Sequence, residues 1–424
     1  MITTIFIFIE RKSNFFKNFI FFNFILVSIF LSFKLHSGPE YDELAHLSHV
    51  NEIFNSKNYW YLGDRNRMPL FNYLLFIFFK LDFLELDFYR IGQLANIFCT
   101  SFITYIFINK IKPMFNSNLV YLVCTTLILF IPILSYIHFL VVESLFFSIF
   151  GLFMYKALEV QDNRSARNIL LLGVFGAFMY LTKATGLFIF LITLFCIVIF
   201  DLFNSKKIDF KLLSISTLIF LVVCSPYLYE NFKNFDGKIF YNVNTTYYIW
   251  YDSWEEVESG TKYFGDRVGI PKMNKNDIPS FQNYISEHSS EEIIKRFSDG
   301  FNVIFKKYSD VSQISGIAIY SLFYLLAILF FKERKILSRI NNKFKFLLFY
   351  TMVLVFSILI SSSWYMYIAT GLRFTIYLFI PLYLCTLSIY DKSIDINNSD
   401  RFKDYIFLLF CIFFVGTSSI LYLL

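Results

Sequence analysis

Residues 185–203 read TGLFIFLITLFCIVIFDLF, and this stretch decides the class of the protein. Its only charged side chain is Asp201, close to its end. A bilayer is crossed by about 20 consecutive apolar residues in a helix, because a helix satisfies every backbone hydrogen bond within the segment. The stretch is therefore predicted to be a transmembrane helix.

Similar apolar runs recur along nearly the whole chain of 424 residues, of which 57% are hydrophobic and 17% charged. This composition leaves too little polar surface for a soluble protein of this length. We expect an all-α polytopic protein with one membrane domain covering 1–424. Its eleven predicted spans lie near 18–35, 89–109, 118–137, 141–157, 168–182, 185–203, 212–229, 313–331, 346–363, 373–390 and 404–423.

Lysine and arginine are concentrated in short segments between the predicted spans. Successive basic segments are separated by two spans, so they all lie on the same side of the membrane. The positive-inside rule assigns these segments, and the N-terminus, to the cytoplasm. The net charge of +6 is then explained by topology, and no nucleic-acid partner is expected. These basic segments lie near 11–17, 110–112, 156–167, 206–211, 332–345 and 392–403.

The same topology places two long polar segments, 36–88 and 230–312, on the outer face. Within the first, the apolar run 69–81 is too short to span and is predicted to be a re-entrant or membrane-surface helix. The second is long enough for a small subdomain of mixed structure. Its Trp250, Tyr251 and Trp254 suit either stacking on a sugar or anchoring at the interface.

The first outer segment opens with HSGPEYDELAHLSH at residues 36–49. A helix beginning near Asp42 places Asp42, His46 and His49 on one stripe, with Glu43 about 100° away. A carboxylate there can act as a general base, and the same three stripe residues also have a spacing that suits a divalent metal. The plainer interpretation is that Asp42 and Glu43 only cap a helix N-terminus.

Five further charged residues lie where spans or helices begin or end on the outer face. Arg65 and Arg67 precede the proline-led run at Pro69, a position that suits a phosphate at the membrane surface. Charges at membrane depth are candidates for function, although snorkelling to the interface explains them equally well. The other three are Glu143, Lys183 and Arg373.

Several short motifs occur in an order that resembles the GT-C type glycosyltransferases, which use polyprenyl-phosphate sugars, and the protein mannosyltransferase and aminoarabinose transferase relatives in particular. The likeness covers about residues 18–235. One departure is Met68, which stands where the family often has a first proline. The Asp42-Glu43-Leu44-Ala45-His46 form is also similar to the dolichyl-phosphate-glucose branch. The motifs are Asp42-Glu43, Leu70 to Leu81, Tyr89 to Leu94, Gly176 to Gly186, Pro226 to Asn231, and Arg373-Phe374 beyond the main region.

The resemblance implies transfer of a sugar from a polyprenyl-phosphate donor to a hydroxyl of a lipid, glycan or protein acceptor. It implies that Asp42 is the general base and that Glu43 orients the acceptor or the sugar. The remaining site residues would contact substrate, with Arg67 leading at the phosphate, and no cofactor or resident metal is expected. These are His46, Arg65, Arg67, Glu143, Lys183 and Arg373.

Two other classes of function fit a multi-span protein with polar outer segments. One is a transporter or flippase for a lipid-linked glycan, which would need charges deep within several spans. The other is an O-antigen-type polymerase or ligase, which would rely on arginine and histidine in the 230–312 segment. A bacterial inner membrane with the site facing the periplasm is expected, although the sequon Asn244-Thr245-Thr246 keeps the endoplasmic reticulum open.

Overall fold

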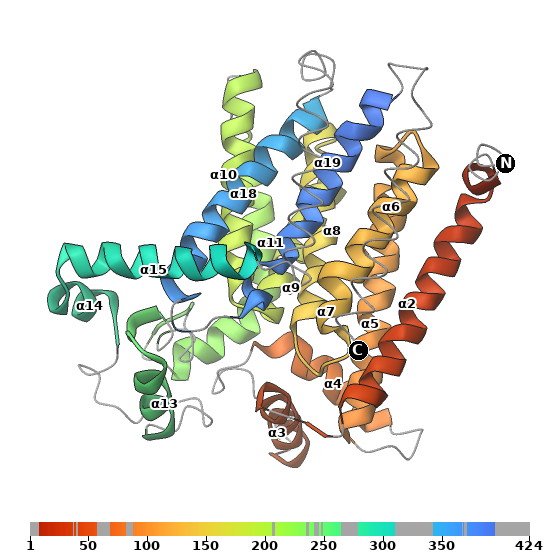
Figure 1. The fold of residues 1–424 in the computed structure, drawn as a ribbon. Coiled ribbons are helices and arrows are strands. Elements are labelled where there is room, and N and C mark those ends of the chain that lie inside the picture. Colours follow the sequence, from red (N-terminus) through yellow and green to blue (C-terminus); the bar gives the residue numbers. More distant parts are fainter. Residues whose placement is uncertain are drawn as a thin grey trace.

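A computed structural model describes residues 8–36, 38–39, 41–56, 68–81, 88–205, 208–234, 237–240, 246, 249–263, 279–309, 342–366, 368 and 371–394. All regular secondary structure in these ranges is helical (Figure 1). The long helices stand side by side in one bundle, and shorter helices collect around one end of it. The predicted all-α class is confirmed for this part of the chain.

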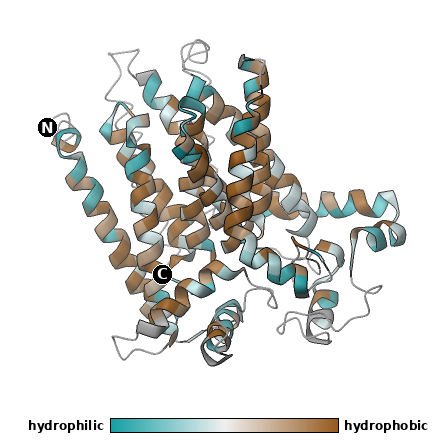
Figure 2. Cartoon of the chain, turned by 180° about the vertical axis from the view of Figure 1, so that it is seen from behind, coloured by the Kyte–Doolittle hydropathy of each residue, from teal (hydrophilic) through white to brown (hydrophobic). Residues whose placement is uncertain are grey.

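Within the described residues, six helical stretches are long and apolar enough to cross a membrane. Their apolar colouring in Figure 2 runs along most of their length. The protein is therefore embedded in a membrane. The six are α2 (Ser13–Leu35), α5 (Phe88–Ile111), α6 (Asn118–Ile128) joined through η2 to α7 (Leu134–Ile137), α10 (Thr185–Ser205), α11 (Phe210–Asn234) and α18 (Asn342–Met366).

Three further helices run within the same bundle: α8 (Glu143–Asp162), α9 (Ala166–Thr182) and α19 (Phe379–Ile394). Helix α8 packs against α5 and α9, α9 against α11, and α19 against α6. Nine of the eleven predicted segments therefore coincide with helices of the bundle. The predicted spans 313–331 and 404–423 lie outside the described residues.

The outward face of α2 shows why lipid suits this bundle. Phe15, Phe19, Phe22 and Phe30 are all more than half exposed. In water, a row of exposed phenylalanines would be a liability, because each ring leaves a large apolar area unburied. Acyl chains cover such a face without cost.

The interface between α5 and α8 is lined with small polar side chains. Thr104 and Ser148 share a hydrogen bond of 2.7 Å between their hydroxyl oxygens, and the Ser144 hydroxyl donates to Asn96 Oδ1 at 3.3 Å. Small residues let two helices approach closely within a membrane, and hydrogen bonds between them fix their register. This interface sets the height at which α8 begins, at Glu143.

Two predicted spans are less regular than the apolar pattern indicated. The span 118–137 is interrupted by a π-helical turn, η2 (Leu129–Ile133), because Pro132 has no backbone N–H to donate within the helix. The span 373–390 begins later than predicted. Two 3-10 turns, η4 (Leu372–Phe374) and η5 (Ile376–Leu378), precede α19, so Arg373 lies in a turn rather than opening a helix.

The shorter helices gather around the end of the bundle at which α2 ends and α5 begins, the lower end in Figure 1. Helices α3 (Tyr41–Ser56) and α4 (Pro69–Leu81) lie there, and α4 has the bounds predicted for the short apolar helix. Helices α13 (Trp254–Tyr263), α14 (Phe281–Glu287) and α15 (Ser290–Ser309) lie to the left of the bundle in Figure 1, with α15 packed against α18. The candidate site lies between α3 and the bundle.

Candidate functional site

Four charged side chains from distant parts of the chain meet at the lower end of the bundle. Arg373 Nη1 forms an ion pair with Asp42 Oδ2, and Arg373 Nε lies 3.9 Å from Glu143 Oε1. Lys183 Nζ lies 3.0 Å from the same Glu143 oxygen. We call these four residues the charge cluster. The structure thus brings together four residues singled out in the sequence.

Glu143 is the hub of the charge cluster because its carboxylate faces both cations. It is the first residue of α8, where the helix dipole favours a negative charge. Its side chain is only 5% exposed. A carboxylate so far from water needs cationic partners, and Lys183 and Arg373 supply them.

Lys183 is placed by a tight turn between α9 and α10. Its backbone N–H donates to the carbonyl of Met179 at the end of α9, and α10 begins two residues later. A Cβ atom at Gly186 would overlap the backbone of Met179 and Tyr180. Glycine at position 186 therefore lets α10 begin directly against α9 and so sets the place of Lys183.

The Lys183 ammonium is a desolvated cation. Burial lowers its pKa below the ordinary lysine value, and the nearby Arg373 lowers it further, although Glu143 acts in the opposite direction. Its side chain is 14% exposed. An anion that reached this position would relieve the burial of the charge.

The charge cluster is most exposed at Asp42 and Arg373. The side chains of Asp42 and Arg373 are 28% and 33% exposed, whereas Glu143 is nearly covered. A guanidinium keeps its charge and can bind an oxyanion through two parallel N–H groups. The exposed pair is therefore where a ligand would first meet the cluster.

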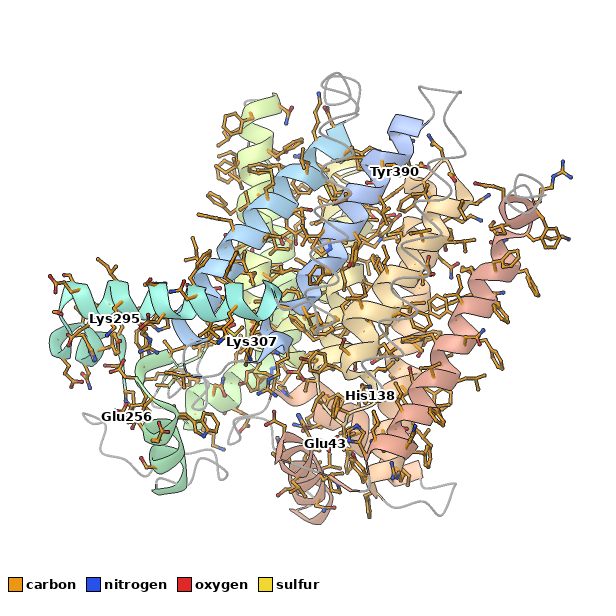
Figure 3. The ribbon with its side chains drawn as sticks, viewed as in Figure 1. Glu43, His138, Glu256, Lys295, Lys307 and Tyr390 are labelled. Carbon is orange, nitrogen blue, oxygen red and sulfur yellow. The ribbon has the colours of Figure 1, made fainter. Side chains whose placement is uncertain are left out.

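Glu43, next to Asp42 in the sequence, points into the bundle. Its carboxylate accepts hydrogen bonds from the Tyr89 hydroxyl, 3.2 Å from both carboxylate oxygens, and from the Leu140 backbone N–H at 2.7 Å. Figure 3 shows Glu43 on α3 at the lower end, with His138 nearby. Glu43 thus ties α3 to α5 and to the loop before α8.

His46 and His49 are joined to α4 by one amide. His46 Nδ1 lies 2.7 Å from Asn72 Oδ1, and Asn72 Nδ2 lies 2.9 Å from His49 Nδ1. Since the amide oxygen accepts and the amide nitrogen donates, His46 carries a proton on Nδ1 and His49 does not. All three residues are buried. These contacts fasten the buried face of α3 to α4.

The predicted stripe of Asp42, His46 and His49 is thus divided between two tasks. Asp42 faces Arg373 in the turn η4, whereas the two imidazoles face α4. Within the described residues, no group of three or more histidine, cysteine or acidic side chains is placed to hold a metal. Arg65 and Arg67, the predicted phosphate contacts, lie outside the described residues.

Two residues in these contacts were not predicted to take part in a site. Asn72 is an amide within the largely apolar run 69–81, and such a residue in a buried helix signals a hydrogen-bonding partner. Tyr89 belongs to the motif Tyr89 to Leu94, but the neighbouring sequence does not show that its hydroxyl contacts Glu43. Only the folded structure, which brings Glu43 of α3 to Tyr89 of α5, reveals this contact.

A second polar cluster, which we call the Asp252 cluster, lies where residues 249–263 and 279–309 meet the end of α18. Asp252 accepts hydrogen bonds from the Tyr284 hydroxyl at 2.9 Å and from Arg296 Nη1 at 3.0 Å. His288 Nε2 lies 2.6 Å from the same carboxylate, and Arg296 Nε donates to the Trp364 carbonyl at 2.9 Å. This cluster fastens the region to the bundle.

The aromatic residues predicted to stack on sugar or anchor at the interface have different surroundings. Trp250 packs against the rings of Phe281, Tyr284 and Trp364, with centroids 5.7 to 6.1 Å apart. Trp254, the first residue of α13, is 48% exposed. Trp254 is the more accessible of the two for either of the predicted roles.

Comparison of the chain with models of known protein families gives no match, and no curated protein is significantly similar to it. Function is therefore inferred from the charge cluster and its surroundings.

Proposed function

We propose that the protein is a membrane glycosyltransferase of the GT-C type, which moves a sugar from a polyprenyl-phosphate donor to an acceptor hydroxyl. The observation that carries this proposal is the charge cluster. A carboxylate, two cations and a second, buried carboxylate meet beside apolar helices. This set of groups suits a reaction that releases an anionic phosphate and removes one proton.

The donor phosphate binds Arg373 and Lys183 in this proposal. Arg373 is one-third exposed and can engage two phosphate oxygens, while Lys183 adds a point charge behind it. Glu143 keeps both cations in place and partly neutralises them before the donor arrives. Arg65 and Arg67 remain proposed as further phosphate contacts.

Asp42 is the general base. Before the donor binds, its carboxylate is paired with Arg373. When the donor phosphate binds Arg373 instead, the Asp42 carboxylate is released from the ion pair. Asp42 then accepts the proton of the acceptor hydroxyl, whose oxygen bonds to the anomeric carbon. The bond from that carbon to the phosphate oxygen breaks, and polyprenyl phosphate leaves. Donor binding and base release are thereby coupled.

Glu43 and His46 hold Asp42 in position. Glu43 is buried under hydrogen bonds from Tyr89 and Leu140, and His46 is bonded to Asn72. Two buried contacts on α3 fix both the rotation and the depth of the helix. We therefore assign Glu43 and His46 positioning roles, rather than direct contact with the reacting sugar.

The membrane topology proposed from the loop charges accompanies this function. Eleven spans with a cytoplasmic N-terminus put the lower end of the bundle on the periplasmic side of a bacterial inner membrane. In the described helices of the bundle, aspartate, glutamate, lysine and arginine lie within two turns of a helix end. A transporter path needs such charges at mid-span, so this distribution favours a transferase.

The test is a comparison of the cell-envelope glycans of a deletion strain and its parent, which names the sugar and the acceptor together. The deletion is complemented with the wild-type gene, with Asp42→Asn, or with Asp162→Asn. Asp162 is the matched control because it lies at the opposite end of α8 and pairs with Lys343 at 2.8 Å. Protein amounts in the membrane are compared by immunoblot.

We expect one sugar modification to disappear on deletion, to return with the wild-type gene and Asp162→Asn, and to stay absent with Asp42→Asn. Full restoration by Asp42→Asn would refute the assigned base. A change in polymer length with all sugars retained would contradict the transferase and favour a polymerase.

A further inference from the structure

Helix α15 (Ser290–Ser309) lies across the bundle rather than along it (Figure 1). It packs against α18, and Figure 3 labels Lys295 and Lys307 towards its two ends. Its residues form three faces around the helix axis, and each face has a different environment.

The first face of α15 is packed against the end of α18. Arg296, Gly300 and Ile304 lie on it and are buried. A Cβ atom at Gly300 would overlap the carbonyl oxygen of Ser363, so the two helices cross in direct backbone contact. The orientation of α15 about its own axis is thereby fixed.

The second face is an exposed apolar stripe. Ile294, Phe297, Phe301 and Phe305 are 67%, 36%, 52% and 68% exposed. Their spacing of three and four residues places them on one side of the helix, next to the packed face. Exposed rings of this size in a continuous row mark an interaction surface.

The third face is polar and lies opposite the packed one. Lys295, Ser298, Asn302 and Lys306 lie on it, all exposed. An apolar stripe beside a polar face with lysines is typical of a helix that lies flat in a membrane surface. Lysine stems extend over apolar surface while the ammonium groups reach the headgroups.

The helix that α15 packs against carries an exposed apolar row of its own. On α18, the side chains of Met352, Phe356 and Ile360 are 65%, 68% and 45% exposed and follow one another at helical spacing. This row runs towards Ser363, where α15 crosses. Lipid that covers the row on α18 therefore reaches the place where α15 crosses.

We propose that α15 lies in the surface of the bilayer, with its stripe among the upper acyl chains and its lysines at the phosphate headgroups. This inference is independent of the transferase proposal, because it rests on the exposed stripe of α15 and on its contact with a membrane-crossing helix. Through Arg296, the same helix holds the Asp252 cluster. The described residues 249–263 and 279–309 are therefore kept at a fixed depth relative to the membrane.

The test uses the unmodified protein in lipid nanodiscs. Phospholipids that carry a photoactivatable diazirine on the acyl chain are illuminated, and labelled peptides are mapped by mass spectrometry. Label is expected at Phe301 and Phe305 and absent from Ser298 and Asn302. A peptide covering 290–309 without label, in a sample whose α18 row is labelled, would overturn the proposal.

A second measurement distinguishes other occupants of the stripe. Nitroxide labels are placed at Phe301→Cys and Asn302→Cys in a variant lacking native cysteines, and their accessibility to oxygen and to a water-soluble nickel complex is compared. The nitroxide at position 301 should be more accessible to oxygen, and the nitroxide at position 302 should be more accessible to the nickel complex. Preference for nickel at both positions would place the stripe in water. Protection of position 301 from both reagents would mean that protein covers it, and either result overturns the proposal.

Discussion

Replacing Glu143 with glutamine removes the carboxylate that Lys183 and Arg373 share. Their nitrogens lie 3.0 and 3.9 Å from Glu143 Oε1. At an effective dielectric constant of about 20, these separations correspond to attractions of about 5.5 and 4.3 kcal/mol. Arg373 keeps Asp42 as a partner, whereas Lys183 loses its closest one. The lost electrostatic attraction therefore affects mainly Lys183.

The net cost is smaller than the attraction, because a stranded lysine can escape by losing its proton. From the ordinary lysine pKa, this release costs about 4.6 kcal/mol at pH 7. Removal of one partner of a buried ion pair costs about 3–5 kcal/mol in other proteins. We expect Glu143→Gln to lower the free energy of unfolding by about 3–4 kcal/mol, within these limits.

The assay is unfolding of the purified protein by SDS in mixed micelles, followed by tryptophan fluorescence. The matched control is Glu159→Gln on the same helix, where the carboxylate is 23% exposed and pairs with Lys156; a loss of about 1 kcal/mol or less is expected there. The double variant Glu143→Gln/Lys183→Met should recover much of the lost stability, because it leaves no buried charge unpaired. A loss in Glu143→Gln no larger than in the control would refute the assigned hub.

Three further outcomes follow from the structure. Gly186→Ala should displace α10 from the end of α9 and lower the melting temperature by several degrees, as for a loss of about 1–3 kcal/mol from overpacking; an unchanged melting temperature would contradict the tight turn. Glu43→Gln should reduce both the initial rate of sugar transfer and the melting temperature. Asp42→Asn should abolish transfer and leave the melting temperature within a few degrees of wild type. If Glu43→Gln abolished transfer at unchanged stability while Asp42→Asn lowered both, Glu43 would be the base and Asp42 the positioning residue. Burial by itself would lower the pKa of His288, but its bonds to a backbone carbonyl and to Asp252 raise the pKa above the ordinary value. The stabilising contribution of His288 is therefore complete below about pH 6.5 and lost as the pH rises through the raised value. After correction for the intrinsic acceleration of amide exchange with pH, hydrogen exchange in the 279–309 region should accelerate over that rise, and no such corrected acceleration should occur in His288→Asn.

Much of the fold could be predicted from apolar length alone. The run 69–81 has the bounds of α4, and the run 185–203 lies within α10 (Thr185–Ser205). Backbone hydrogen bonding forces such runs to be helical in lipid. Local interruptions were not predicted, because the π-helical turn around Pro132 depends on how the freed backbone groups find other partners.

The candidate site was predictable as a set of residues but not as a set of contacts. Asp42 and Arg373 are separated by 331 positions, and no local pattern shows that they pair. The helical periodicity of α3 placed Asp42 and Glu43 on different faces. It could not show which face enters the bundle, because Tyr89 and the Leu140 N–H decide that.

The amphipathic character of helix α15 is visible in the sequence. Ile294, Phe297, Phe301 and Phe305 follow helical spacing within a segment rich in charge, which is the pattern of an amphipathic helix. Only the structure shows that this stripe stays exposed, since the packed face is formed by Arg296 and Gly300 instead.

The central claim is that the charge cluster binds a lipid-linked phosphate, and binding of undecaprenyl phosphate tests it most directly. Radiolabelled undecaprenyl phosphate is titrated onto the full-length protein in nanodiscs, with wild type, Arg373→Gln and the control Arg164→Gln compared. Arg164 pairs with Asp201 and Asp209 at the opposite end of the bundle. We predict saturable binding that weakens about tenfold or more in Arg373→Gln, as expected for a charge-assisted hydrogen bond of about 1.5–3 kcal/mol, with Arg164→Gln unchanged. Equal binding by all three proteins, or none by wild type, would contradict the account.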